Sequence, residues 1–241
     1  MDESPAAAVI CAAGSSYRMG GIKKEFQRLD PSHPLTVLGS AVSAFAAVPS
    51  VQTIVIAVNE NCEADARLAL APERLSAQRP EVLFVTGGKS RRASVFSALR
   101  ALSPRNPCYV LIHDGARPWV SPSLIENLIE EVKKYQAVIP LLPVTETPKE
   151  CGSSLEGRVT REEAVFIKTH LKRANTGVAQ TPQAFRFQEI LRAHEKAAEA
   201  GDEEFTDDAE IWGRFCGPVA VIPGSPENRK ITFPQDFGNE C

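Results

Sequence analysis

Residues 6–13 read AAAVICAA, an apolar run of strand length, and the helical pattern PLTVLGSAVSAFAAV follows it from residue 34. The alternation then repeats along the chain. Further apolar runs cover 52–58, 81–85, 109–114 and 136–144, and helical patterns cover 89–102 and 121–135. Runs of valine and isoleucine without polar alternation are typical of strands that are buried on both faces. The pattern therefore predicts an α/β fold in which helices cover both faces of a doubly wound, parallel sheet.

The helix predicted over 121–135 carries the clearest start signal in the chain. Ser121 is a favourable cap and Pro122 takes the first helical position, where its missing N–H costs nothing. Beyond this helix and the strand after it, we predict a helix over 183–201 that stops at Gly201, and a last strand over 218–224.

Residues 145–180 interrupt the strand–helix alternation. Glycines, serines and charged residues surround short alternating pieces such as RVTR, a pattern that indicates a β-hairpin. A disordered linker is the alternative, although the segment VFI at 165–167 is more apolar than a linker needs. With no internal repeat, we predict one domain over 1–241 and a protruding arm over 145–180.

Composition and charge exclude several classes of protein. A net charge of -3 over 241 residues argues against a protein that coats nucleic acid, so we expect no nucleic-acid partner. Basic residues nevertheless form local clusters, such as Lys89, Arg91 and Arg92, that suit a small anion, with scattered surface charge as the alternative. Six cysteines show no C-x-x-C pair, and the apolar start is too short to span a bilayer. We therefore expect a cytoplasmic protein without a membrane partner.

The loop after the first apolar run, within ICAAGSSYRMGGIKKEF at 10–26, combines small residues with cations. Gly14 and its small neighbours would let backbone N–H groups approach a phosphate closely. Arg18 and Lys24 would add positive charge from one side. A tight turn with solvated cations is the alternative.

Three further segments carry similar signals. Gly87 and Gly88 open a second loop after the run 81–85, for which a plain helix-entry turn is the alternative. Asp114 ends a buried apolar run and could bind Mg²⁺, and Arg117 could face an anion; an ion pair between these two side chains is the alternative. Lys230 precedes a short apolar piece near the end of the chain.

Ligands of open α/β sheets bind outside the carboxyl ends of the strands, where these segments are predicted to lie. Small-residue loops, cations and one carboxylate suit phosphoryl or nucleotidyl transfer, in which catalysis is largely positioning and charge neutralisation.

Taken in order, the segments resemble the 2-C-methyl-D-erythritol 4-phosphate cytidylyltransferase family. The matching motifs are AAGSSYRMG with the following KK, GGKSRRASV, IHDGARP, PVTETPK, TPQAF with an arginine ahead of it, TDDA and ENRKIT. They run from about residue 7 to 236, nearly the whole chain. The resemblance implies a Rossmann-like, mostly parallel sheet and a homodimer built by the arm.

The resemblance also implies the site residues. The catalytic residues would be Arg18, Lys24 and Lys230. The nucleotide would be held by Ala12, Ala13, Gly14, Ser15, Gly87, Gly88, Ser94 and Gly115. The methylerythritol phosphate would be bound by Arg117, Thr147, Arg173, Thr181 and Thr206, of which Thr147 and Arg173 would come from the partner subunit. Asp114 would lie by Mg²⁺ or another divalent cation. CTP would bind first, and the substrate phosphate would attack its α-phosphorus.

Some positions depart from the family pattern. Lys89 stands where the family commonly has an acidic residue, and KKEF leaves both Lys23 and Lys24 as candidates for the catalytic lysine. Two other functions remain open at this point. A ribitol-5-phosphate cytidylyltransferase would share the CTP side and differ in the polyol pocket, and a catalytically silent nucleotide-binding module would share the fold.

Overall fold

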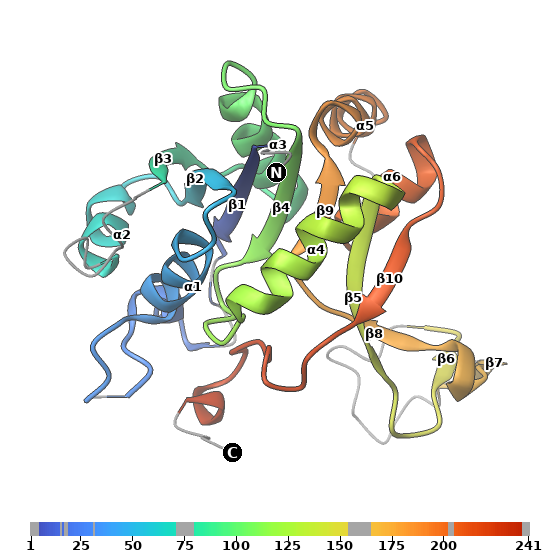
Figure 1. The fold of residues 1–241 in the computed structure, drawn as a ribbon. Coiled ribbons are helices and arrows are strands. Elements are labelled where there is room, and N and C mark those ends of the chain that lie inside the picture. Colours follow the sequence, from blue (N-terminus) through green and yellow to red (C-terminus); the bar gives the residue numbers. More distant parts are fainter. Residues whose placement is uncertain are drawn as a thin grey trace.

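The computed structural model describes residues 5–14, 16, 19–30, 32–70, 80–153, 165–201 and 205–237. A mostly parallel sheet runs through its centre, with the strand order β10-β5-β9-β4-β1-β2-β3 (Figure 1). The strands of this path are β1 Ala6–Ala12, β2 Val51–Val58, β3 Glu81–Thr86, β4 Tyr109–Asp114, β5 Ala137–Pro143, β9 Gln183–Arg186 and β10 Ala220–Pro223. β1 pairs in parallel with β2 and β4, β2 with β3, and β5 with β10. The predicted fold class is confirmed.

Helices cover both faces of the sheet. Strand β1 shows why, because its side chains alternate between two separate cores. Ala8 and Ile10 pack with α1 (Val37–Ala46) and α4 (Pro122–Tyr135). Ala7 and Val9 pack on the other face with α3 (Arg91–Leu102), α5 (Phe187–Glu199) and α6 (Asp208–Phe215). A short helix, α2 (Glu63–Ala69), follows β2 and was not predicted from the sequence.

The start of the helix predicted over 183–201 is wrong. Residues Gln183–Arg186 form β9, which lies antiparallel between β4 and β5, and the helix begins only at Phe187. Ala184 and Phe185 are fully buried there. Four residues directly before a helical pattern resemble its first turn, and only pairing with β4 and β5 makes them a strand.

The terminal signals of the helices are otherwise as predicted. The Ser121 hydroxyl accepts a hydrogen bond from the Leu124 N–H, and Pro122 opens α4. Gln136 ends α4 in the left-handed conformation and therefore does not start the next strand. Gly201 follows α5 with a φ of +94°, a conformation that glycine adopts without strain.

Within the range predicted for the arm, β6 (Lys149–Cys151) and β7 (Ile167–His170) form an antiparallel pair apart from the main sheet (Figure 1). β8 (Gly177–Ala179), at the end of that range, instead pairs with β5 of the main sheet. None of the described helices is long and apolar enough to cross a membrane.

Candidate active site

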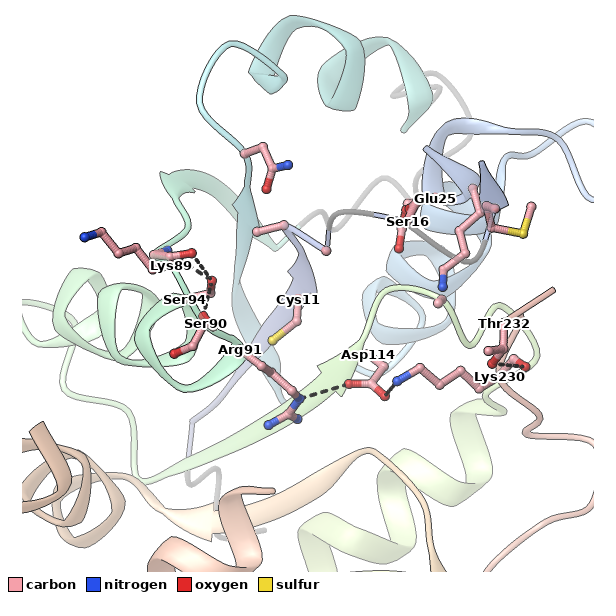
Figure 2. A pocket seen from close by; sticks show the side chains of 17 residues that line it. Cys11, Ser16, Glu25, Lys89, Ser90, Arg91, Ser94, Asp114, Lys230 and Thr232 are labelled. Atoms are coloured by element: carbon pink, nitrogen blue, oxygen red, sulfur yellow. Dashed lines mark hydrogen bonds and ion pairs between the residues drawn. The ribbon is translucent and has the colours of Figure 1, made fainter. Parts of the chain in front are cut away.

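A pocket of about 510 Å³ opens where β1, β2 and β4 end and α3 begins (Figure 2). Four basic side chains and two carboxylates line it, together with small and polar residues. The lining residues are Cys11, Ala13, Gly14, Ser16, Met19, Lys24, Glu25, Asn59, Gly88, Lys89, Ser90, Arg91, Ser94, Asp114, Ala116, Lys230 and Thr232. An excess of positive charge in a concave site suits a polyanionic ligand.

Asp114, the last residue of β4, lies between two cations in this pocket. Lys230 Nζ lies 2.8 Å from its Oδ2 and Arg91 Nε lies 3.3 Å from its Oδ1, and the two side chains approach from opposite sides (Figure 2). The alternative ion pair with Arg117 is also present but longer, at 3.8 Å. Burial alone would raise the pKa of Asp114, but Arg91 and Lys230 outweigh it and hold that pKa well below its usual range. The carboxylate is therefore ionised at neutral pH.

The backbone of Asp114 is held by a short chain of hydrogen bonds. Its N–H donates to the Thr181 hydroxyl at 3.0 Å, and that hydroxyl lies 3.0 Å from His113 Nδ1. His113 Nε2 lies 3.1 Å from the Arg117 carbonyl, which can only accept, so Nε2 carries the proton. Burial lowers the pKa of His113 to about 4, which keeps the ring neutral.

The C-terminal segment reaches the site because hydrogen bonds tie it to the loop after β4 and to Thr181. Asn228 is fully buried and its Nδ2 donates to the Thr181 carbonyl at 2.8 Å. Arg117 Nη1 donates to the Asn228 carbonyl at 2.8 Å, and the Ile231 N–H donates to the Ala116 carbonyl at 2.9 Å. These bonds place Lys230 beside Asp114.

The glycine loop after β3 packs closely against the loop after β1. A side chain at Gly87 would place its Cβ 2.4 Å from Ala13 Cβ and 2.9 Å from Ser94 Oγ. The Gly88 N–H donates to Ser94 Oγ at 3.1 Å, and Ser90 caps α3 by accepting from the Ala93 N–H. Only glycine permits this approach, so the residue type follows from packing between the two loops.

The two candidate lysines take different places. Lys24 lines the pocket, whereas Lys23 Nζ donates to the Gly14 carbonyl at 2.6 Å. With the amide of Asn59 oriented to satisfy both of its polar atoms, Asn59 also contacts Lys23 and the Ala13 carbonyl. Lys23 therefore holds the loop after β1, and Lys24 is the lysine that faces the cavity.

The structure brings many of the predicted site residues together. Those that line the pocket are Ala13, Gly14, Lys24, Gly88, Ser94, Asp114 and Lys230. Four further predicted residues lie next to lining residues in the chain: Ala12, Gly87, Gly115 and Arg117. Thr181 contacts the lining residue Asp114 through the hydrogen bond described above. Ser15 and Arg18 lie outside the described residues.

None of the five predicted substrate residues lines the pocket of its own chain, and Thr147, Arg173 and Thr206 also lie outside the segments that carry the lining residues. Thr147 and Arg173 are exposed in the segment around the β6–β7 pair, where Arg173 Nη1 donates to the Thr145 carbonyl at 2.9 Å. Thr206 precedes α6 and donates through its hydroxyl to Glu210 at 2.8 Å.

Sequence reasoning did not assign three charged residues of the pocket, Glu25, Lys89 and Arg91, to the site. Arg91 lay in a recognised basic cluster, but nothing in the sequence distinguished it from its neighbours Lys89 and Arg92. Glu25 is buried, and burial raises its pKa; its Oε2 lies 3.4 Å from Ser16 Oγ. A buried carboxylate next to two lysines in sequence gives no signal of its own.

A divalent cation fits this site only with help from a ligand. No cluster of three or more histidine, cysteine, aspartate or glutamate side chains occurs in the described part of the chain. Mg²⁺ is commonly held by one or two carboxylates, with substrate phosphates and water completing its shell. The ionised Asp114 carboxylate beside a basic cavity agrees with that arrangement, so the residues fit the metal.

The match to a known family decides what kind of protein carries this pocket. The family model described as 2-C-methyl-D-erythritol 4-phosphate cytidylyltransferase matches residues 6–239. The chain belongs to this family. Its relatives include the bifunctional enzyme IspD/IspF of Bradyrhizobium sp. (strain ORS 278), which is 40% identical over 237 residues covering 97% of this chain and 55% of that protein. The chain thus spans about half the length of the curated relatives that it matches first.

Solved members of the family share the fold. The 4-diphosphocytidyl-2C-methyl-D-erythritol synthase of Anaerococcus prevotii is 28% identical, with a TM-score of 0.77 and coverage of 98% of this chain and 96% of that one. The 2-C-methyl-D-erythritol 4-phosphate cytidylyltransferase of Thermus thermophilus is 29% identical, with a TM-score of 0.70 and coverage of 97% and 95%. The predicted family is confirmed.

Proposed function

We propose that this chain joins CTP and 2-C-methyl-D-erythritol 4-phosphate to give the cytidine diphosphate derivative of methylerythritol and pyrophosphate, a step of isoprenoid precursor biosynthesis. The observation that carries the proposal is the basic pocket at the strand ends, with Asp114 held between Arg91 and Lys230, in a member of this family.

The chemistry asks for charge neutralisation rather than for a base. The substrate phosphate already carries an anionic oxygen, which attacks the α-phosphorus of CTP in line while the bond to pyrophosphate breaks. Negative charge grows on the five-coordinate phosphorus and on the leaving group. Cations that are already in place stabilise this charge more than they stabilise the ground state. Lys24 and Lys230 line the pocket and would act in this way, together with Arg18.

The nucleotide would lie against the small-residue loops. Ala12, Ala13, Gly14 and Ser15 would cradle the nucleotide through backbone N–H groups. Gly87, Gly88 and Ser94 would contact the cytosine and the ribose, and Gly115 would lie by the phosphates. Asp114 would hold Mg²⁺ together with phosphate oxygens, and the metal would supply additional neutralisation of charge on the phosphates.

The methylerythritol phosphate would be bound by Arg117, Thr181 and Thr206 of one subunit and by Thr147 and Arg173 from the arm of a partner. We therefore propose a homodimer built through the arm over 145–180, with the nucleotidyltransferase domain over 1–241. The exposed positions of Thr147 and Arg173 support this arrangement, since neither residue reaches its own pocket. A cytoplasmic location agrees with the use of CTP.

Turnover with defined substrates tests the proposal. The purified protein is incubated with CTP, Mg²⁺ and either methylerythritol phosphate or ribitol 5-phosphate, and pyrophosphate release is followed. Pyrophosphate release with methylerythritol phosphate is expected. This release should be lost when ATP replaces CTP and when the metal is chelated. Release with ribitol phosphate alone would contradict the proposed substrate, and release with neither polyol would contradict the activity.

A further inference from the structure

A row of alternating charges leads from the pocket into the core behind it. Asp208 Oδ2 lies 2.7 Å from Arg91 Nη1, and Arg91 Nε lies 3.3 Å from Asp114 Oδ1. On the far side, His194 Nε2 lies 3.1 Å from Asp208 Oδ1. With Lys230 on the other oxygen of Asp114, the row joins α5, α6, α3, β4 and the C-terminal segment.

The inner members of this row are far from solvent. Asp208 and His194 are both 0% exposed. Because a carboxylate only accepts, His194 donates through Nε2, and its Nδ1 has no partner among the described residues. The ring also stacks on Phe96, with the centroids 6.3 Å apart. The imidazole is therefore held in one orientation and fixes one oxygen of Asp208.

An ion pair whose carboxylate is fully buried contributes little to stability alone. Removing two charges from water costs free energy that their attraction repays only in part, and an apolar contact would join α6 to α3 at least as well. Burial raises the pKa of Asp208, but the charge of Arg91 and the hydrogen bond from His194 outweigh that effect and lower it, so the carboxylate stays ionised.

The geometry around Arg91 indicates that its ion pair with Asp208 fixes the orientation of the guanidinium. Its planar guanidinium is held at Nε by Asp114 and at Nη1 by Asp208, so two carboxylates fix the plane. With one partner alone the guanidinium could rotate about that contact. Lys230 is exposed at the cavity, and in the proposed reaction it would turn to the phosphates of the nucleotide. Arg91 is then the closest remaining cation to Asp114.

We propose that Asp208, oriented by His194, is a positioning residue: it holds Arg91 against Asp114 so that the Asp114 carboxylate keeps its orientation toward the metal–nucleotide complex. The proposal rests on the proposed function for its substrate, but it concerns how the chain builds its metal-binding carboxylate. Neither Asp208 nor His194 lines the pocket itself.

Two neighbouring isosteric substitutions test it. Asp208→Asn removes the charge that faces Arg91, whereas Asp207→Asn changes the residue before it, which caps α6 and contacts Gln183 but not Arg91. The first readout is the Mg²⁺ dependence of CTP binding, measured by calorimetry. The quantity compared is the Mg²⁺ concentration at which half of the metal-induced gain in CTP affinity is reached. Residues that orient a metal ligand typically contribute about 10–100-fold to metal affinity, so Asp208→Asn is expected to raise this Mg²⁺ concentration roughly 10-fold or more. CTP affinity without metal is expected to stay within about threefold.

Turnover supplies the second readout. Per folded molecule, Asp208→Asn is expected to lower kcat roughly 10–100-fold with little change in the KM for CTP, and Asp207→Asn to leave both near wild type. If Asp208 acts through Arg91, adding Asp208→Asn to Arg91→Gln should cost little further.

Three results would overturn the positioning role: an unchanged Mg²⁺ requirement in Asp208→Asn, equal losses in Asp207→Asn, or independent losses in the double variant. Absence of turnover in the wild-type protein would count against the proposed function alone, because the Mg²⁺ titration reads the positioning role without turnover.

Discussion

Lys230 Nζ lies 2.8 Å from Asp114 Oδ2, so a lysine from the C-terminal segment closes a site whose carboxylate lies at the end of β4. The two residues are separated by 116 positions in the chain. The contact joins Asp114, the pocket carboxylate at the end of a strand, to Lys230, a cation that the family resemblance implies for charge stabilisation.

Replacing Lys230 tests this contact. Lys230→Ala is expected to lower kcat on the order of 10²–10³-fold, by analogy with the loss of one preorganised donor to a developing anion. The fold should persist, because Arg91 still compensates Asp114. Pyrophosphate release and thermal unfolding are the measurements. Lys134→Ala, on the surface of α4 and paired with Glu131, is the control and should behave as wild type. A near-normal rate in Lys230→Ala would remove this lysine from the mechanism.

Substitutions of the neighbouring lysines of the first loop, Lys23 and Lys24, should affect different kinetic constants. Lys24→Ala is expected to reduce kcat on the order of 10²–10³-fold, since this side chain faces the cavity. Lys23→Ala removes the bond to the Gly14 carbonyl and should mainly raise the KM for CTP, because the loop loses a contact that holds its shape. Steady-state kinetics with varied CTP distinguishes the two. The reverse pattern would make Lys23 the catalytic lysine.

Packing at Gly87 leaves no room for a methyl group. Gly87→Ala would bring a Cβ within 2.4 Å of Ala13 Cβ, so the loops after β1 and β3 must separate. Loss of CTP affinity and a lower Tm are expected. Gly213→Ala is the matched control, since Gly213 lies in α6 with nothing within 4 Å of the added atom. That change should raise stability by up to about 1 kcal/mol, because alanine is the better helix former. Equal effects in the two variants would contradict the packing argument.

The depressed pKa of His113 predicts a loss of stability in acid. The unfolded chain binds a proton near pH 6.5, whereas burial lowers the folded pKa to about 4. Between these values the unfolded state binds more protons, so stability falls as pH falls, by about 3 kcal/mol over the whole window. Stability above pH 6.5 is unaffected by this group.

Urea unfolding of the metal-free protein at several pH values measures the effect. His113→Gln should flatten the difference between pH 6.5 and pH 4 relative to wild type, whatever its stability at neutral pH. His170→Gln, on the exposed strand β7, serves as the control. An unchanged slope in His113→Gln would show that another group causes the acid sensitivity.

Mixing two inactive variants tests the shared site. Lys230→Ala damages the pocket and Arg173→Ala damages the arm, so each homodimer should be inactive. A mixed dimer would contain one intact pocket facing one intact arm. Random exchange of subunits is then expected to restore about a quarter of wild-type turnover. Light scattering checks the dimer. No recovery after proven exchange would contradict a site shared between subunits.

Local signals were sufficient for much of the fold. Ser121, Pro122 and Gly201 act within a few residues of their position in the chain, and the structure agrees with each of them. Strand β9 was mistaken for a helical turn, because its four residues become a strand only through pairing with β4 and β5.

The candidate site, too, could be predicted from local sequence only in part. Close backbone approach and charge require glycine, lysine and a strand-end aspartate wherever these loops lie, so the loop motifs predict those residues of the site. Folding places Arg91, rather than its neighbours Lys89 and Arg92, between Asp114 and Asp208, and it turns Lys24 toward the cavity while Lys23 bonds to the Gly14 carbonyl. Neighbouring charges in the chain differ in the partners that they meet, and these partners come from segments that lie far apart in the sequence.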